Sequence, residues 1–140
     1  MPTDTITVKT TAPATKSETW HYYTEAEHVI NWNFAGEGWH CPKATNDLRE
    51  GGEFEIVMAE KTGTMKMELE GTYTKIEPET HIEYTLENGR HVKVDFTDAD
   101  GGTEVKVTFD PAEKMDPDDQ RKHWQAIMDN FRKYVGSVEA

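Results

Sequence analysis

The sequence has a single cysteine, Cys41, among its 140 residues, so an internal disulfide is excluded. Apolar runs extend over only a few residues, which excludes a transmembrane helix. The N-terminal residues have neither the basic nor the apolar region of a signal peptide. These absences lead us to expect a soluble, cytoplasmic protein without membrane partners.

Basic residues are also scarce. Lysine and arginine together number 15 against 27 aspartates and glutamates, which gives a formal net charge of −12, and no local cluster of basic residues offsets it. Such a chain repels the phosphates of nucleic acids and of anionic lipids. We therefore exclude nucleic-acid and membrane-surface partners and interpret the acidic composition as a well-solvated surface.

The chain length fits one ordinary domain that buries a hydrophobic core without disulfides. Hydrophobic residues make up 35% and charged residues 30% of the sequence, a composition of folded rather than disordered proteins. Neither an internal repeat nor a low-complexity segment is present. We expect a single domain over residues 1–140.

The first 42 residues predict one strand, two short helices and a loop. Residues 5–11 alternate between apolar and polar positions, as in a half-buried strand, and Pro13 ends the pattern. The second helix is expected to begin with a capping box in which Thr24 and Glu27 satisfy each other's backbone donors. Residues 33–42, rich in glycine and aromatic residues, are interpreted as a loop.

Residues 43–110 alternate with period two, and turns that contain glycine interrupt the alternation. The predicted turns are residues 50–52, 61–63, 88–89 and 100–102, where glycine and asparagine tolerate a positive φ. Consecutive hairpins that share one apolar face predict a six-stranded antiparallel meander with its other face in water.

The last segment changes to helical periodicity. Asp116 can cap a helix whose first turn holds Pro117 and two acidic residues. Apolar residues then recur on one stripe up to Val138, so a helix of roughly 33 Å is expected over residues 117–138. Since this stripe and the apolar sheet face must bury each other, the sequence predicts an α+β fold with a curved sheet wrapped around the helix.

Four stretches of the sequence resemble motifs of one known family. They are residues 20–32, 47–52, 71–84 and 124–131. In that order they are similar to the family patterns W-x-x-x-T-D-P-E-H…W, D-L-R-P-G-G, G-x-Y-x-x-I-x-P-x-x-x-I-x-Y and G-W-x-x-x-L-x-x-F. In this order they resemble the START-like, or SRPBCC, helix-grip superfamily, and within it the domains similar to the activator of Hsp90 ATPase. The sequence departs from the family pattern at Ala26, Asn33, Glu50 and His123.

The resemblance implies the helix-grip (Bet v 1-like) fold with a ligand cavity between the C-terminal helix and the sheet. It also implies a role in stress responses and an Hsp90-type chaperone as partner. The candidate ligand-binding residues are Trp32, Trp39, His40, Met58, Met67, Leu69, Tyr84, Phe96, His123, Trp124, Met128 and Phe131. Each has a structural alternative: the aromatic stripe can fill the core, Trp32 can plug the helices against the sheet, and His123 can be a surface histidine.

No pattern of a cofactor, metal or catalytic site is present. His28, His40 and Cys41 match no zinc spacing, and the sequence lacks P-loop, GxGxxG and GxSxG motifs. The paired glutamates fall on polar strand faces, where solvation explains them. We therefore expect no cofactor, no metal and no defined catalysis.

Three functions stay open from the sequence. The first is a binding protein that holds a small, largely apolar or amphipathic molecule in the cavity, oriented by one or two polar groups. The second is a co-chaperone-like module that stimulates the ATPase of Hsp90. The third is an enzyme, such as a cyclase, dehydratase or hydrolase, that uses a cavity residue.

Overall fold

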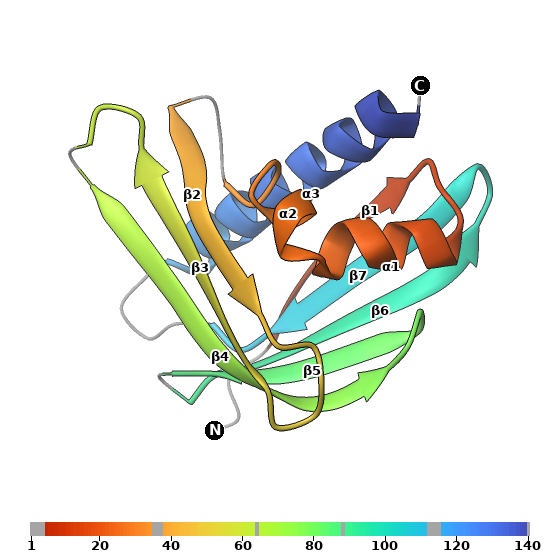
Figure 1. Cartoon of the computed structure of the whole chain (residues 1–140), viewed down its shortest axis with the longest axis horizontal. Helices are drawn as coiled ribbons and strands as arrows, with labels where there is room; N and C mark the ends of the chain where they lie inside the picture. Colours follow the sequence, from red (N-terminus) through yellow and green to blue (C-terminus); the bar gives the residue numbers. More distant parts are fainter. Residues whose placement is uncertain (1–4, 35–37, 64, 88, 112–115, 140) are drawn as a thin grey trace.

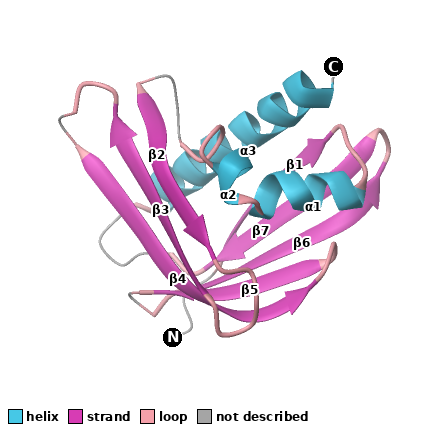
Figure 2. Cartoon of the chain, viewed as in Figure 1, coloured by secondary structure: helices cyan, strands magenta, loops and turns pink. Residues whose placement is uncertain are grey.

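The computed structural model describes residues 5–34, 38–63, 65–87, 89–111 and 116–139. Within them a curved antiparallel sheet packs against helices (Figures 1 and 2). The elements are β1 (Ile6–Ala12), α1 (Lys16–Thr24), α2 (Ala26–Val29), β2 (Trp39–Asn46), β3 (Glu53–Glu60), β4 (Lys66–Glu77), β5 (His81–Leu86), β6 (His91–Ala99), β7 (Gly102–Phe109) and α3 (Pro117–Glu139). In this part of the chain, no helix is long and apolar enough to cross a membrane.

The seven strands follow the order β1-β7-β6-β5-β4-β3-β2, and every neighbouring pair is antiparallel. The predicted meander is β2 to β7, and β1 joins it beside β7, with Ile6 opposite Phe109. Gly51, Gly63, Gly89 and Gly101 have φ between 80 and 88°, as the predicted turns require. The predicted α+β helix-grip fold is therefore confirmed.

The core lies between the concave face of the sheet and the three helices. Val94 and Val107 on the sheet and Phe131 and Val135 on α3 have no exposed surface. The helix begins as the sequence predicts, because Asp116 Oδ1 accepts a hydrogen bond from the backbone N–H of Asp118 at 2.8 Å. In Figure 1, α3 runs along β1, while α1 and α2 cover the sheet beside it.

The predicted capping box at residues 24–27 is wrong. The N-cap residue of α2 is Glu25, and no side chain caps this helix. The hydroxyl of Thr24 instead donates to the carbonyl oxygen of Trp20 at 2.7 Å, within the last turn of α1. A threonine at the end of one helix can bond back to the preceding turn, which competes with capping of the next helix.

The predicted loop over residues 33–42 is also wrong in part. Trp39, His40, Cys41 and Pro42 lie on β2, while residues 35–37 fall outside the described residues. A proline is tolerated here because β2 is an edge strand and its register with β3 shifts between His40 and Lys43. Glycines and a proline therefore suggested a loop where the chain forms an irregular edge strand.

Candidate functional site

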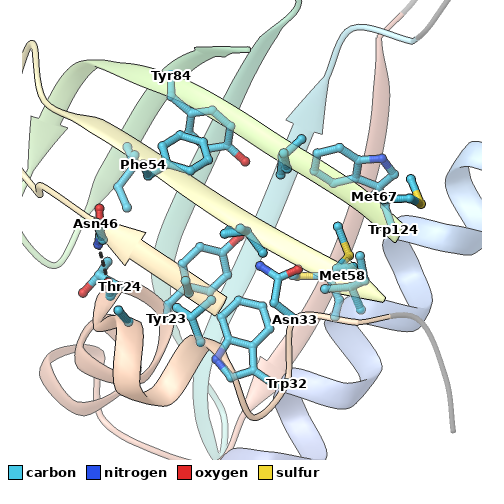
Figure 3. A pocket seen from close by; sticks show the side chains of 18 of the residues that line it. Tyr23, Thr24, Trp32, Asn33, Asn46, Phe54, Met58, Met67, Tyr84 and Trp124 are labelled. Carbon is cyan, nitrogen blue, oxygen red and sulfur yellow. Dashed lines mark hydrogen bonds between the residues drawn. The ribbon is translucent and has the colours of Figure 1, made fainter. Parts of the chain in front are cut away.

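A cavity of about 150 Å³ lies between the concave side of β2 to β5 and the three helices (Figure 3). Its walls are mainly apolar and aromatic. The sheet contributes Ala44, Phe54, Ile56, Met58, Met67, Leu69 and Ile82, and the helical side contributes Ala26, Val29, Trp32, Trp124, Ile127 and Met128. A cavity of ~150 Å³ with apolar walls is the size that holds benzene in a protein interior.

The position of α3 explains why this space is not filled by the core. The helix packs most closely along β1, at one edge of the sheet, and the strands β2 to β4 form the opposite edge. Met67 on β4 lines the cavity and is still 40% exposed, so the cavity approaches the surface near this strand. The space between the two edges is therefore a half-enclosed pocket.

Two tryptophans form rigid parts of the wall. Trp124 stacks on Phe109 with ring centroids 4.0 Å apart. Trp32 is 2% exposed, packs its ring on Phe131 at 4.7 Å and donates its Nε1–H to the carbonyl oxygen of Tyr22 at 3.0 Å. Trp32 is thus both a core residue that joins the helices and a residue of the cavity wall.

The structure brings most of the predicted ligand-binding residues together. The predicted residues that line the cavity are Trp32, Met58, Met67, Leu69, Tyr84, His123, Trp124 and Met128. Phe96 and Phe131 lie behind them in the core, where both rings pack against Tyr23. Trp39 and His40 lie on β2 and are not among the residues that line the cavity.

His123 occupies the cavity wall rather than the surface. It lies in the second turn of α3, one position before Trp124, and is half-buried. Burial lowers the pKa of its imidazole below the ordinary value, because the charged form is poorly solvated there. The ring is therefore a neutral polar group beside the apolar walls at neutral pH.

One group of polar side chains in the cavity is closed by internal hydrogen bonds. The hydroxyl of Tyr73 donates to Asn46 Oδ1 at 2.7 Å, and the Nδ2 of Asn46 donates to the carbonyl oxygen of Thr24. This chain joins β4 and β2 to the end of α1. These hydrogen bonds hold the wall of the cavity together at the end remote from Trp124 (Figure 3).

Two further tyrosines, Tyr23 on α1 and Tyr84 on β5, point their hydroxyl groups into the cavity from opposite walls (Figure 3). Burial raises the pKa of both phenols well above 10, so both are neutral. Arg90 also lines the cavity; burial lowers the pKa of its guanidinium, which the charge of Asp110 partly counteracts. Among the described residues that line the cavity, none is an aspartate or glutamate.

The sequence did not reveal several of these polar residues. Tyr23 lies in a nine-residue helix that has no clear apolar stripe, so nothing marks its inward face. Arg90 follows the predicted turn at residues 88–89, and neither it nor Gln120 nor Asn46 belongs to a recognisable pattern. Their common position became visible only after β2, β5 and α3 were brought together.

One cluster outside the cavity has the side chains of a metal site. His21, Glu25 and His28 each offer one ligand atom, and these atoms lie within 4.8 Å of one another. His21 Nε2 is 2.8 Å from Glu25 Oε2, and the Nδ1 of His28 shares a hydrogen bond with the hydroxyl of Tyr134 at 2.6 Å. A divalent cation could be held there. His40 and Cys41 are not part of this group.

Cys41 does not have the surroundings of a nucleophile. It is buried, its thiol donates to the carbonyl oxygen of Lys43 at 3.4 Å, and burial raises its pKa. A reactive cysteine requires the opposite, a thiolate stabilised by neighbouring positive charge. Cys41 is a structural residue of the edge strand.

Comparison with solved structures finds the same fold in several bacterial proteins. The AHSA1-like protein from Aeromonas hydrophila is 32% identical over 96% of this chain and 94% of its own, with a TM-score of 0.90. A protein from Cytophaga hutchinsonii is 35% identical over 98% of this chain and 94% of its own, with a TM-score of 0.78. A protein from Chromobacterium violaceum shares the fold at 17% identity, with a TM-score of 0.84 over 94% of this chain and 96% of its own.

A comparison with proteins of curated function finds no match. The family model described as "Activator of Hsp90 ATPase homolog 1-like protein" matches residues 13–136, which is most of the chain. The match extends from the end of β1 to the last turns of α3 and so includes the helices and strands that line the cavity. This chain belongs to the activator of Hsp90 ATPase homolog 1-like family.

Proposed function

We propose that this protein binds a small, largely apolar molecule in the cavity between α3 and the sheet. The observation that supports the proposal is the cavity itself: about 150 Å³, half-enclosed, with predominantly apolar walls. Burial of apolar ligand surface supplies roughly 25 cal/mol per Å² before the cost of association is subtracted. A ligand of about one aromatic ring fits the volume.

The walls combine rigid and adaptable parts, which suits a binding site. Trp32 and Trp124 are held by ring contacts with Phe131 and Phe109. Met58, Met67 and Met128 are flexible, and their thioethers adapt to ligands of different outline. Ligands somewhat larger than one ring can therefore enter when these side chains change rotamer.

A substitution that fills the cavity tests the proposal. Ala44 on β2 lines the cavity and is half-buried, so Ala44→Leu should occupy space that a ligand needs. We expect the affinity for a one-ring probe such as toluene, measured by NMR titration, to fall about tenfold or more. The reason is that the added methyl groups exclude an equal volume of ligand.

Ala59→Leu is the matched control. Ala59 is also half-buried and lies on the neighbouring strand β3, but it is not among the residues that line the cavity. This variant should bind toluene as the original protein does. Two results would show that the cavity is not a binding site. In the first, the original protein and Ala59→Leu both fail to bind toluene or other one-ring probes; in the second, Ala44→Leu leaves the affinity unchanged.

The family name supports a second candidate function, the stimulation of an Hsp90-type chaperone. The family model matches residues 13–136, and its description refers to activation of the Hsp90 ATPase. The protein is added to Hsp90, and the rate of ATP hydrolysis is measured over a range of protein concentrations. A saturable increase in rate is the expected result for this function, and an unchanged rate contradicts it.

A further inference from the structure

We propose that the molecule bound in the cavity carries a carbonyl oxygen, which accepts hydrogen bonds from the hydroxyl groups of Tyr23 and Tyr84. This inference rests on the proposed function, since it specifies the polar chemistry of a ligand whose apolar part fills the cavity. The ligand class is thus a small aromatic or aliphatic ketone, aldehyde or ester rather than a pure hydrocarbon. The positions, partners and charge state of the two hydroxyls support this choice.

The two hydroxyls are held in place by the packing of their rings. The ring of Tyr23 contacts those of Trp32 and Phe131 with centroids 5.0 and 5.3 Å apart. The ring of Tyr84 contacts Phe54 at 4.9 Å in an edge-to-face arrangement. Both hydroxyls point into the cavity (Figure 3). The buried neighbours already restrict the rotamers of the two tyrosines, so ligand binding costs little additional side-chain entropy.

A comparison with Tyr73 shows what distinguishes these two tyrosines. The hydroxyl of Tyr73 lies in the same cavity but donates to Asn46, so its hydrogen is already placed. Within the described part of the chain, the hydroxyls of Tyr23 and Tyr84 have no hydrogen-bond partner. Neither hydroxyl oxygen is fully buried, so both can be reached from the cavity, where a ligand atom can supply the partner that the protein does not.

The charge distribution favours an acceptor on the ligand. Both phenols stay protonated, because burial raises their pKa values, and each therefore has one O–H to donate. The guanidinium of Arg90 adds positive potential near Tyr84, and its charge opposes part of the rise in pKa that burial causes in that phenol. A carbonyl oxygen has two lone pairs and can accept from both hydroxyls at once. It also avoids the large cost of moving a full charge out of water.

An isosteric pair of probes separates this inference from the function on which it rests. Acetophenone and α-methylstyrene have nearly the same shape, but a C=CH₂ group in the second replaces the C=O group of the first. Dissociation constants for both are measured by NMR titration or calorimetry with the full chain. We expect the protein to bind acetophenone roughly tenfold more tightly, the net effect of two hydrogen bonds that the alkene cannot make.

Tyrosine-to-phenylalanine variants assign this preference to the two hydroxyls. Tyr23→Phe and Tyr84→Phe should each reduce the preference about threefold, and the double variant should abolish it while α-methylstyrene still binds. Tyr134→Phe is the control, because the hydroxyl of Tyr134 bonds His28 outside the cavity. This control should keep the full preference.

The outcomes distinguish the two proposals. If both probes bind with equal affinity, or if the double variant keeps the preference for acetophenone, the carbonyl inference is overturned and the binding function stands. If neither probe binds to the folded protein, the binding function fails, and the carbonyl inference fails with it. Because phenylalanine keeps the ring, circular dichroism should show an intact fold in each variant.

Discussion

Gly71 in β4 lies directly beneath the ring of Phe54, a cavity residue that is 6% exposed. A Cβ atom placed on Gly71 would stand 2.7 Å from Cε1 and Cζ of Phe54 and 2.9 Å from the carbonyl oxygen of Thr85. The oxygen belongs to the backbone of β5 and cannot yield. A side chain at position 71 would therefore push the ring of Phe54 towards the cavity.

We expect Gly71→Ala to lower the free energy of unfolding by about 1–3 kcal/mol, as overpacked core positions do. Gly136→Ala is the control, because the nearest atom to its added Cβ is Pro13 Cγ at an ordinary 3.8 Å. That variant, in the helix α3, should instead be stabilised by up to about 1 kcal/mol. Urea unfolding followed by tryptophan fluorescence measures both, and equal effects would contradict the packing argument.

At the scale of elements, like charges meet on the outer face of β3 and β4 and at Glu87, the residue that follows β5. Glu70 lies opposite Glu55 across the β3–β4 pair, and its carboxyl also interacts with Glu87. The hydrogen bond and charge of Glu87, with those of Glu55, raise the pKa of Glu70 to about 7. Lys43, 3.0 Å from Glu55, holds the pKa of Glu55 below its ordinary value.

This arrangement predicts a pH-dependent effect of Glu70→Gln. Between pH 4.5 and about 7 the folded protein keeps the proton of Glu70 and the unfolded chain has lost it, so the contribution of this residue to stability falls as the pH rises. Removing the carboxylate should therefore raise the melting temperature at pH 8 and raise it less at pH 4.5.

Glu68→Gln is the control on the same strand, because Glu68 lies 3.4 Å from the ammonium group of Lys66. It removes an attraction, so no gain in melting temperature is expected at pH 8. Thermal unfolding followed by circular dichroism at the two pH values measures both variants. A gain for Glu70→Gln of the same size at both pH values would show that repulsion is not its cause.

At the same scale, the elements with a strong periodic pattern were the ones predicted correctly. The strands β3 to β7 alternate, and α3 has an apolar stripe that runs through Met128, Phe131 and Val135. The strand β2 was missed over residues 39–42, where Pro42 and a shift of register weaken the pattern. Edge strands need to satisfy only one neighbour, so their sequences are less constrained.

At the scale of the whole molecule, the cavity is assembled from segments that are remote in sequence. Tyr23, Tyr84 and His123 come from α1, β5 and α3, and the sheet and helices meet in one continuous core around them. Behind the cavity, Phe131 and Val135 are fully buried. The packed region stabilises the fold, so the space beside it can stay open for a ligand.

The sequence by itself determined the order of the elements, the face of each strand that turns inward, the long terminal helix and the family. These features follow from local periodicity, turn residues and short motifs. Only the tertiary structure decided which side chains border the cavity and which of them lack a partner. Trp124 and Phe131 share one helical stripe, yet the first lines the cavity and the second fills the core. That difference depends on where α3 rests along β1, and periodicity along a chain carries no information on the position of one element against another.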